Sequence, residues 1–288
     1  MNVKEILHRT PPPVLYHYTT QQGLLGIINS KEIWATHTQY LNDIREFRHA
    51  TDLVKQELSL MADATPVEDK VLRDRLWDMK NAVSRTLQNI NVCVCSFSEN
   101  GDVLSQWRAY GGPASGFAIG FSGEELREMS REWGWLVPVA YEEEEQRRVI
   151  RSLLNDVLQE LQELRNPIKE LEHPAGNLVA YLNRYAPILK HNAFQEEHEW
   201  RVVTRPLLCT LKSFGYRTGP SMLIPYSRLS LESRPALAIR EIVIGPTPHP
   251  EQSLRSVHGL LTKNSIETGG PHRQGVSIRL SAVPYRNW

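Results

Sequence analysis

The segment that most constrains the fold comes early in the chain, where the sequence pattern changes twice within a short span. Residues 15–20 are aromatic and β-prone, residues 21–30 carry apolar side chains at helical spacing, and residues 33–36 are β-prone again. The prolines Pro11–Pro13 cannot continue a helix and separate this segment from what precedes it. The sequence therefore predicts a strand, a helix and a second strand, with His17 at the centre of the first strand.

The composition is that of a globular protein, and the order of the predicted helices and strands is typical of an α+β fold. Hydrophobic residues make up 41% of the 288 residues and charged residues 23%, which is ordinary for a soluble domain. Lys+Arg and Asp+Glu balance at 33 each, so no global field draws the chain to nucleic acid or to an anionic membrane. Because the net charge is zero, any basic surface must be a local patch. There is no internal repeat and no linker long enough to force a domain split.

The cysteines and the N-terminus favour a cytoplasmic protein with no membrane partner. Cys93 and Cys95 alternate with valines, so they would share one face of a strand as buried free thiols. Such thiols suit a reducing cytosol. Residues 1–10 lack the apolar core of a signal peptide. No run approaches the roughly 18 apolar residues that a membrane span requires.

Periodicity and turn signals predict the other elements. Helices are expected over residues 44–62, 67–89, 103–110, 123–135, 145–164, 177–190 and 250–264, and strands over 91–98, 116–121, 136–141, 242–246 and 276–283. Residues 193–204 pass from a polar loop into a strand. We expect one domain over residues 1–288, with a mainly helical insertion around 123–190.

His17 is the first candidate for a functional residue. On a strand, Leu15 and Thr19 would share its face, while Tyr16 and Tyr18 would point to the other. A lone histidine in an aromatic strand is more often a hydrogen-bonded structural residue than a catalytic one. The case for function therefore depends on what else comes near it.

Two carboxylates late in the chain are the second candidate. In strand geometry Glu197, Glu199 and Arg201 would point one way. This pattern fits a solvated strand edge equally well. In the functional interpretation, a carboxylate meets a sugar hydroxyl or a developing positive charge. That chemistry favours Glu199, which is closer to the apolar part of the strand.

Small hydroxyls and aromatic rings form a third group. Ser96 and Ser98 end a predicted strand, and Trp107 and Tyr110 lie on the next helix. Together they would give a floor and walls to a flat ligand, or they would cap a helix and fill the core.

A fourth group follows the second strand. Helix capping is the commoner role for Asn42 and Asp43, whereas Tyr40 could stack on a ligand ring. Motifs with a known mechanism are missing: there is no GxGxxG after a strand, no GxxxxGK[ST], no HExxH and no GxSxG. His249, His258 and His272 lack metal-ligand spacing, so no metal site is predicted.

Several short motifs, in order, resemble the bacterial DUF2971 family from about residue 14 to residue 286. They are Leu15-Tyr16-His17-Tyr18-Thr19, Gly23 to Asn29, Ile33-Trp34, Tyr40 to Asp43 with Glu46-Phe47, Cys95 to Ser98, Leu104 to Trp107 with Tyr110, Gly116 to Phe121, Phe194 with Glu197 to Arg201, and Ile242 to Gly245.

The opening strand, helix and strand also look like those of the ADP-ribosyltransferase superfamily, which includes the DarT-type toxins. That resemblance implies a split mixed β-sheet core with a helical insertion, and NAD as substrate. It implies that His17 holds a ribose of NAD, that Glu199 or else Glu197 is the catalytic glutamate, and that Tyr40 covers nicotinamide. The full expected NAD-binding set is His17, Tyr18, Thr19, Tyr40, Asn42, Ser96, Ser98, Trp107, Tyr110 and Arg201.

The implied activity is NAD-dependent transfer of ADP-ribose to nucleic acid or protein, in a toxin or phage-defence protein that an antitoxin partner could hold in check. Arg108, Arg201 and Arg205 could line a cleft that holds a nucleic-acid strand. Two alternatives stay open. One is a catalytically silent module that binds a nucleotide or a protein, and the other is an NAD glycohydrolase with water as the acceptor.

Cleavage of NAD at the nicotinamide–ribose bond needs only a few catalytic residues. Cleavage of the nicotinamide–ribose bond passes through an oxocarbenium-like state, and nicotinamide leaves as a neutral ring without a general acid. One positioned carboxylate can stabilise the cation, while a histidine and an aromatic wall fix its orientation. The testable expectation is that His17 and Glu199 line one cleft.

Overall fold

The structure is a computed structural model. It describes residues 5–6, 8–41, 45–85, 91–112, 115–163, 178, 182, 185–232, 238–269 and 275–285. Asn42 and Asp43, with their expected roles, lie outside these residues.

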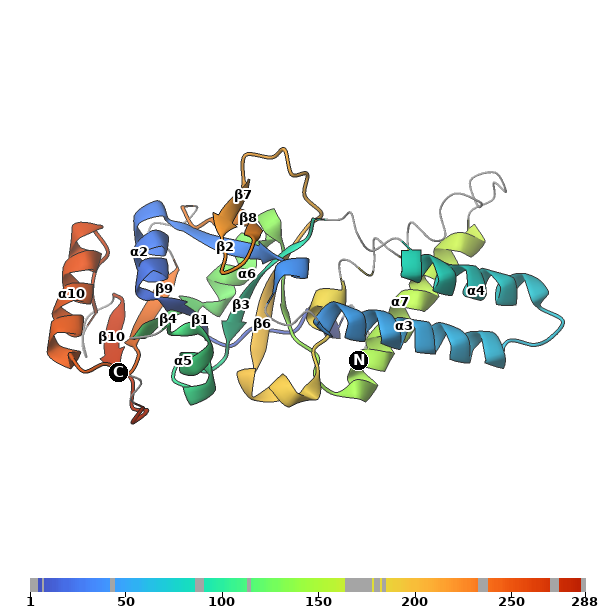
Figure 1. The fold of residues 1–288 in the computed structure, drawn as a ribbon, viewed down its shortest axis with the longest axis horizontal. Helices are drawn as coiled ribbons and strands as arrows, with labels where there is room; N and C mark the ends of the chain where they lie inside the picture. The colour runs from blue at the N-terminus through green and yellow to red at the C-terminus, as the bar shows by residue number, and fades with distance from the viewer. Residues whose placement is uncertain are drawn as a thin grey trace.

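A large mixed β-sheet forms the centre of the molecule (Figure 1). Its strands are β1 (Val14–Thr20), β2 (Glu32–His37), β3 (Cys93–Ser98), β4 (Gly116–Ser122), β5 (Gly134–Pro138), β6 (Glu199–Thr204), β7 (Phe214–Thr218), β8 (Leu223–Ser230), β9 (Ile239–Ile244) and β10 (Ser277–Leu280). The main path runs β10-β9-β4-β1-β3-β2-β8-β7, with β6 pairing β3 and β5 pairing β6. Only β9 and β10 pair in parallel among these strands. The expected α+β class with a mixed sheet is confirmed.

The sheet forks at β3. One edge of β3 pairs with β6 from Val94 to Ser98. The opposite edge is shared, because Cys93 and Val94 pair with β2 while Ser98 alone pairs with Tyr16 of β1. Strands β1 and β2 therefore leave β3 at different points, and the sheet opens between them.

Helices and short 3₁₀ turns connect the strands. They are α2 (Gln21–Ser30), η1 (Thr38–Tyr40), α3 (Arg45–Ala64), α4 (Lys70–Arg85), α5 (Leu104–Tyr110), α6 (Gly123–Trp133), α7 (Glu143–Glu163), η2 (Ala186–Ile188), η3 (Asn192–Glu197) and α10 (Pro250–Lys263). Helix α2 has the predicted bounds: the Thr20 side chain accepts from the Gly23 amide at its start, and Lys31 ends it in the left-handed conformation (φ 52°).

The described residues form three hydrophobic clusters, a small one around Tyr18 and Trp107 and two large cores that stabilise the fold. The first large core lies between one face of the sheet and α2, α6 and α10, and includes Leu15, Ile28, Ile119, Val202 and Leu261. The predicted position of Cys93 and Cys95 on one strand face is confirmed, because both are free, buried thiols in this core. The second core joins α3, α4 and α7, which extend together to one end of the molecule (Figure 1).

The expected insertion around 123–190 contributes both to the helices and to the sheet. It supplies α6 and α7, but also β5, which pairs with β6. Helices α3 and α4, which pack with α7, come from residues that precede β3. The helix expected to reach Lys190 does not do so, because the chain passes through η2 and then forms a bridge at Leu189.

The β7–β8 hairpin was not among the elements predicted from the sequence pattern. Pro225 lies within β8, and Gly219-Pro220 interrupts the pattern between the strands. No helix among the described residues is long and apolar enough to cross a membrane.

Candidate functional site

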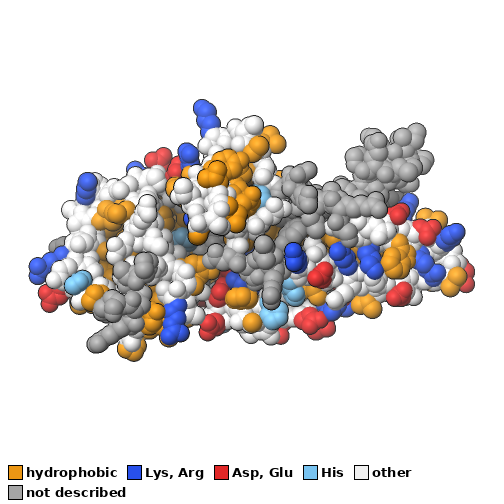
Figure 2. Space-filling view, in the orientation of Figure 1, with side chains coloured by type: hydrophobic (Ala, Val, Ile, Leu, Met, Phe, Trp, Pro, Cys, Tyr) orange, Lys and Arg blue, Asp and Glu red, His pale blue; other side chains and the backbone are white. Residues whose placement is uncertain are grey.

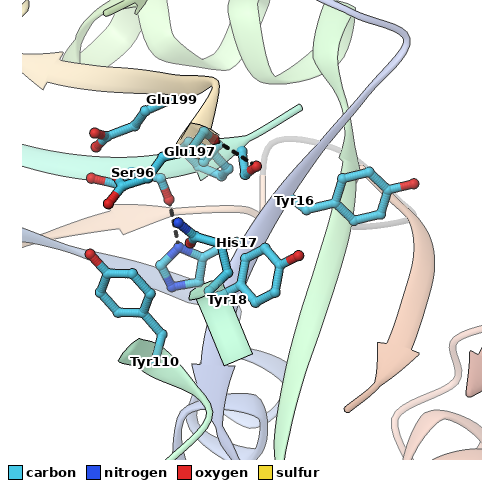
Figure 3. Close-up of a pocket in the computed structure, with 10 residues that line it drawn as sticks. Tyr16, His17, Tyr18, Ser96, Tyr110, Glu197 and Glu199 are labelled. Atoms are coloured by element: carbon cyan, nitrogen blue, oxygen red, sulfur yellow. Dashed lines mark hydrogen bonds between the residues drawn. The ribbon is translucent and has the colours of Figure 1, made fainter. Parts of the chain in front are cut away.

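A pocket of about 70 Å³ lies where β1 and β3 separate (Figure 3). Its lining comes from β1, β3, α5, η3 and β6. The lining residues are Tyr16, His17, Tyr18, Ser96, Phe97, Ser98, Gln106, Tyr110, Glu197 and Glu199. His17 and Glu199 both line this pocket, although 181 residues separate them along the sequence. In strand register they belong to opposite faces of the sheet, His17 with Ile119 and Glu199 with Ser98, and the pocket lies in the gap between β1 and β3.

His17 bridges the gap between the two strands. Its Nδ1 lies 2.9 Å from the backbone oxygen of Ser96, and its ring packs against Phe97 at a centroid distance of 5.7 Å. A carbonyl oxygen can only accept, so Nδ1 carries the proton and Nε2 is the acceptor of the neutral ring. Burial lowers the pKa of His17, which keeps the ring neutral. His17 therefore offers a hydrogen-bond acceptor to a ligand.

Tyr110 contributes a hydroxyl from the C-terminal end of α5. In Figure 3 this hydroxyl is directed toward the side of the pocket where Glu197 and Glu199 lie. Burial raises the pKa of Tyr110 to about 12, so the group stays protonated. Within the described part of the chain the hydroxyl has no hydrogen-bond partner. It is available to a ligand.

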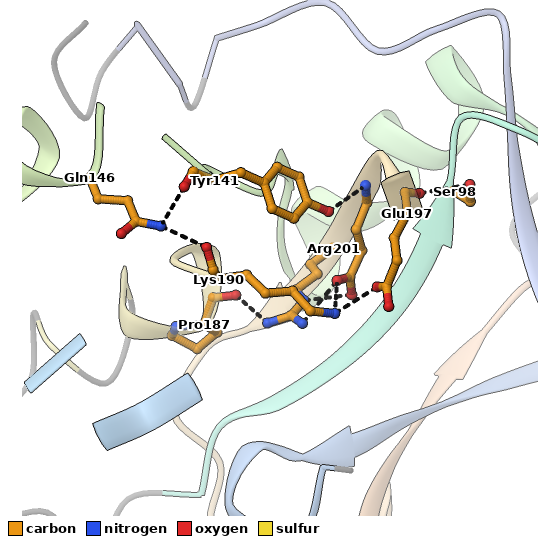
Figure 4. A network of polar contacts seen from close by, with 8 residues as sticks. Ser98, Tyr141, Gln146, Pro187, Lys190, Glu197 and Arg201 are labelled. Carbon is orange, nitrogen blue, oxygen red and sulfur yellow. Dashed lines mark hydrogen bonds and ion pairs between the residues drawn. The ribbon is translucent and has the colours of Figure 1, made fainter. Parts of the chain in front are cut away.

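Glu199 is a buried carboxylate in an ion-pair network. Figure 4 shows this network with Arg201, Lys190 and Glu197 labelled. Arg201 donates from Nε to Oε1 at 2.7 Å and from its second nitrogen to Oε2 at 3.0 Å. Lys190 Nζ lies 2.9 Å from the same Oε2. Burial alone would raise the pKa of Glu199, but Arg201 and Lys190 outweigh it and lower the pKa to about 2. Glu199 therefore stays ionised at any physiological pH.

Glu197 differs from Glu199 in position and in charge state. It ends η3 instead of lying on a strand, so the expected shared strand register of Glu197 with Glu199 is wrong. The reason is His198, which has a left-handed backbone (φ 41°) and turns the chain between the two glutamates. Glu197 Oε2 pairs with Lys190 Nζ at 2.6 Å, yet burial raises the pKa of Glu197. Its side chain is partly exposed.

Residues that the sequence did not single out hold this network in place. Lys190 joins the two glutamates. Gln146 of α7 donates from Nε2 to the Lys190 and Ala140 backbone oxygens at 2.7 and 2.8 Å. The Tyr141 hydroxyl accepts from the Glu199 amide at 3.0 Å. A lysine in a loop and a glutamine on a helix carry no sequence signal for such a role.

The other predicted site residues lie outside the pocket lining. Arg201 is buried behind Glu199 and donates to the Pro187 oxygen at 2.6 Å. Trp107 packs edge-on against Tyr18 at 4.7 Å, and its Nε1 donates to Asp102. Tyr40 packs edge-on against His37 at 5.4 Å and does not reach the pocket.

Thr19 and Arg205, which were also expected at the site, do not line the pocket. Thr19 lies near Gly23, where an added Cβ would meet its hydroxyl at 1.8 Å. Arg205, which was expected to line a strand-holding cleft with Arg108 and Arg201, instead donates to the Arg131 and Glu132 backbone oxygens. Among the residues described, no group of three or more His, Cys, Asp or Glu side chains is placed to hold a metal ion.

Comparison with known families gives one match. The DUF2971 family model, described as a protein of unknown function, matches residues 106–202. This match supports the resemblance that the sequence motifs indicate. The matched DUF2971 segment runs from α5 to β6 and so contains Gln106, Tyr110, Lys190, Glu197 and Glu199. No curated protein and no solved structure matches the chain.

Proposed function

We propose that the chain is an NAD-dependent ADP-ribosyltransferase whose pocket receives the nicotinamide–ribose end of NAD. The observation that carries this proposal is the convergence of His17, Tyr110, Glu197 and Glu199 on one pocket. Four elements, of which only η3 and β6 are neighbours in the sequence, supply a neutral acceptor, an unpaired hydroxyl and two carboxylates. The resemblance of the opening strand, helix and strand to the ADP-ribosyltransferase superfamily supports the same function.

The two glutamates suit different roles because their environments shift their pKa values in opposite directions. Glu199 keeps its negative charge, which stabilises the positive charge that develops on the ribose. Glu197, with its raised pKa and partly exposed side chain, suits a base that removes a proton from the acceptor. His17 and Tyr110 would bind ribose hydroxyls and fix the orientation.

The proposed reaction replaces one bond by another at the ribose C1′ atom. The C–N bond to nicotinamide breaks, and its electron pair leaves with the neutral ring. A new bond forms from C1′ to the nucleophilic atom of the acceptor, whose proton passes to Glu197. The balance requires no oxidant, reductant or metal ion.

The size of the pocket sets a condition on this proposal. Pockets for drug-sized ligands measure roughly 300–1,000 Å³, whereas this one measures about 70 Å³. The pocket must widen to admit a ring with its ribose, and the rest of a dinucleotide would lie outside it. Glu197 and Tyr110 are partly exposed, so their side chains can move to open it.

Nicotinamide release tests the proposal. Purified protein is incubated with NAD labelled in the nicotinamide ring, with and without cell extract, and the wild type is compared with Glu197→Gln and Glu199→Gln. Glu251→Gln, an exposed glutamate on α10, is the control. We expect release by the wild type and the control, and at least about a hundredfold loss in Glu197→Gln, as for removal of a general base. The thermal midpoint of each variant shows whether it is folded.

The outcomes separate the alternatives. Nicotinamide release without label from the adenylate half in any macromolecule would indicate an NAD glycohydrolase. If the wild type releases no nicotinamide with any extract, the enzyme proposal is wrong and a silent binding module remains. One observation favours the silent binding module. Arg201 and Lys190 already donate to both Glu199 oxygens, which leaves this carboxylate occupied.

A further inference from the structure

The segment from residue 205 to residue 231 differs in charge from the rest of the chain. It contains Arg205, Lys212, Arg217 and Arg228 and no Asp or Glu, in a chain of zero net charge. Arg205 is held by backbone oxygens. Lys212, Arg217 and Arg228 are exposed, and none of them forms an ion pair with a residue that the structure describes. The β7–β8 region is therefore a local basic surface.

An exposed aromatic ring lies beside these arginines. Trp34 of β2 is 45% exposed and stacks on Tyr226 of β8 at a centroid distance of 4.2 Å and an interplanar angle of 25°. One face of the indole is thus covered by Tyr226. Figure 2 shows hydrophobic side chains gathered over β7 and β8, with Lys and Arg side chains projecting beside them.

Strand register places both arginines on the same face as the ring. Trp34 is opposite Arg228, and Thr36 is opposite Tyr226. Arg217 follows Gly215, the register partner of Tyr226, by two residues, and donates to the Thr36 hydroxyl at 3.2 Å. We call Trp34, Tyr226, Arg217 and Arg228 the Trp34 platform. On this face β2 adds one acid, Glu32, at the end away from the β3 fork.

The Trp34 platform and Glu199 of the pocket share one face of the sheet. Thr36 pairs with Val94 of β3, and Ser96 and Ser98 follow on the same face. Their partners across β3 are Arg201 and Glu199. The platform therefore lies across β3 from the ion-pair network, on the side where the sheet forks.

We propose that the Trp34 platform binds single-stranded nucleic acid, which would be the acceptor of the proposed ADP-ribosyl transfer. A base stacks on the free face of Trp34, and Arg217 and Arg228 contact the flanking phosphates. A duplex hides the faces of its bases, so the indole selects single strands. An acidic peptide would engage the arginines but leave the indole face unused. As a statement about the acceptor, this inference rests on the proposed function.

Binding without NAD tests the inference. Fluorescence anisotropy measures the full-length protein with fluorescein-labelled oligo(dT) and oligo(U), and with a duplex of the same length. We expect single strands to bind more tightly, and Trp34→Ala to weaken binding roughly 5- to 150-fold. Trp77→Ala, which removes a 41% exposed tryptophan from α4, is the matched control and should bind like the wild type. Trp34→Phe should restore part of the affinity.

Salt dependence tests the arginines. Replacing Arg217 and Arg228 together by Gln should lower the slope of log affinity against log salt by about 1.4, since each phosphate contact on a single strand contributes about 0.7. The inference is wrong if single strands do not bind at low salt, if Trp34→Ala binds like the wild type, or if Trp77→Ala weakens binding equally.

The two proposals can fail separately. The binding assay contains no NAD, and the nicotinamide assay scores cleavage whatever the acceptor. If the wild type releases nicotinamide but binds no oligonucleotide, only the acceptor is wrong. If it binds oligonucleotides but releases no nicotinamide, the platform stands as a binding surface and the enzyme proposal falls. Label from the adenylate half of NAD on the oligonucleotide would support both.

Discussion

At the scale of single residues, the site depends on a balance of buried charges. Glu199, Lys190 and Arg201 are all buried, and each ion needs its partners because burying an unpaired charge is costly. Glu197 completes the cluster from a partly exposed position. Two carboxylates and two cations balance, so each buried ion has a counter-ion and the network fixes the geometry of the site.

Glu199→Gln should therefore destabilise the protein strongly, because it leaves Lys190 and Arg201 buried without their main counter-ion. We expect a loss of about 3–5 kcal/mol in the free energy of unfolding, measured by urea denaturation at pH 7. The control Glu251→Gln should change it by less than about 0.5 kcal/mol. A loss below about 1 kcal/mol for Glu199→Gln would contradict the role assigned to this network.

His17 should make stability depend on pH. Its pKa is lowered in the folded protein by burial, so its neutral form contributes stability above the ordinary histidine pKa of about 6.5, and this contribution is lost as pH falls toward the folded-state pKa. Relative to His17→Gln, the wild type should lose up to about 1.4 kcal/mol per pH unit between about pH 6.5 and 5. His37 is present in both proteins and cancels. Parallel pH profiles would contradict a neutral His17 with a lowered pKa.

At the scale of elements, the helical end of the molecule positions the pocket. Gln146 of α7 is buried and bonds to the backbone at Lys190, while its Oε1 lies 2.8 Å from His49 Nε2 on α3. The segment that carries Lys190 is thereby fixed to both helices.

Gln146→Met keeps the volume but removes the hydrogen bonds that Gln146 donates to the Lys190 and Ala140 backbone oxygens and its contact with His49. We expect a loss of about 1–3 kcal/mol in unfolding free energy, seen as a lower urea midpoint at an unchanged slope. Gln252→Met, an exposed position on α10, is the matched control. Equal urea midpoints for the two variants would show that Gln146 does not fix the Lys190 segment to the helices.

Local patterns predicted most elements because their physical signals are local. Helix α2 has its cap at Thr20 and its apolar spacing within ten residues, and β3 and β4 are continuous buried strands. The β7–β8 hairpin was not predicted, since its proline and its exposed apolar side chains do not alternate cleanly.

The site was predictable only in part. His17, Glu197 and Glu199 could be selected from their motifs, but Lys190 and Gln146 could not. Their roles arise from contacts between α7, η2 and β6 that only the folded chain creates. The turn at His198 likewise has no clear sequence signal. The sequence does not distinguish a histidine with a left-handed backbone from a histidine within an extended strand.

At the scale of the whole molecule, the sheet and the helical end meet at the pocket. The fork at β3 opens a gap beside β1, and the second core holds the segment that supplies the glutamates. The Trp34 platform extends the same face of the sheet across β3. This arrangement would place a small-molecule site and a strand-binding surface side by side on one scaffold.

The central claim is that this pocket binds NAD, and calorimetric titration of NAD into the purified protein tests it most directly. Tyr110→Phe is the decisive variant, because it removes a pocket hydroxyl that has no partner among the described residues. We predict one NAD per wild-type chain, affinity roughly 2- to 12-fold weaker for Tyr110→Phe, as for loss of one hydrogen bond, and no change for Glu251→Gln. No binding to the wild type, or equal affinity for Tyr110→Phe, would contradict the account.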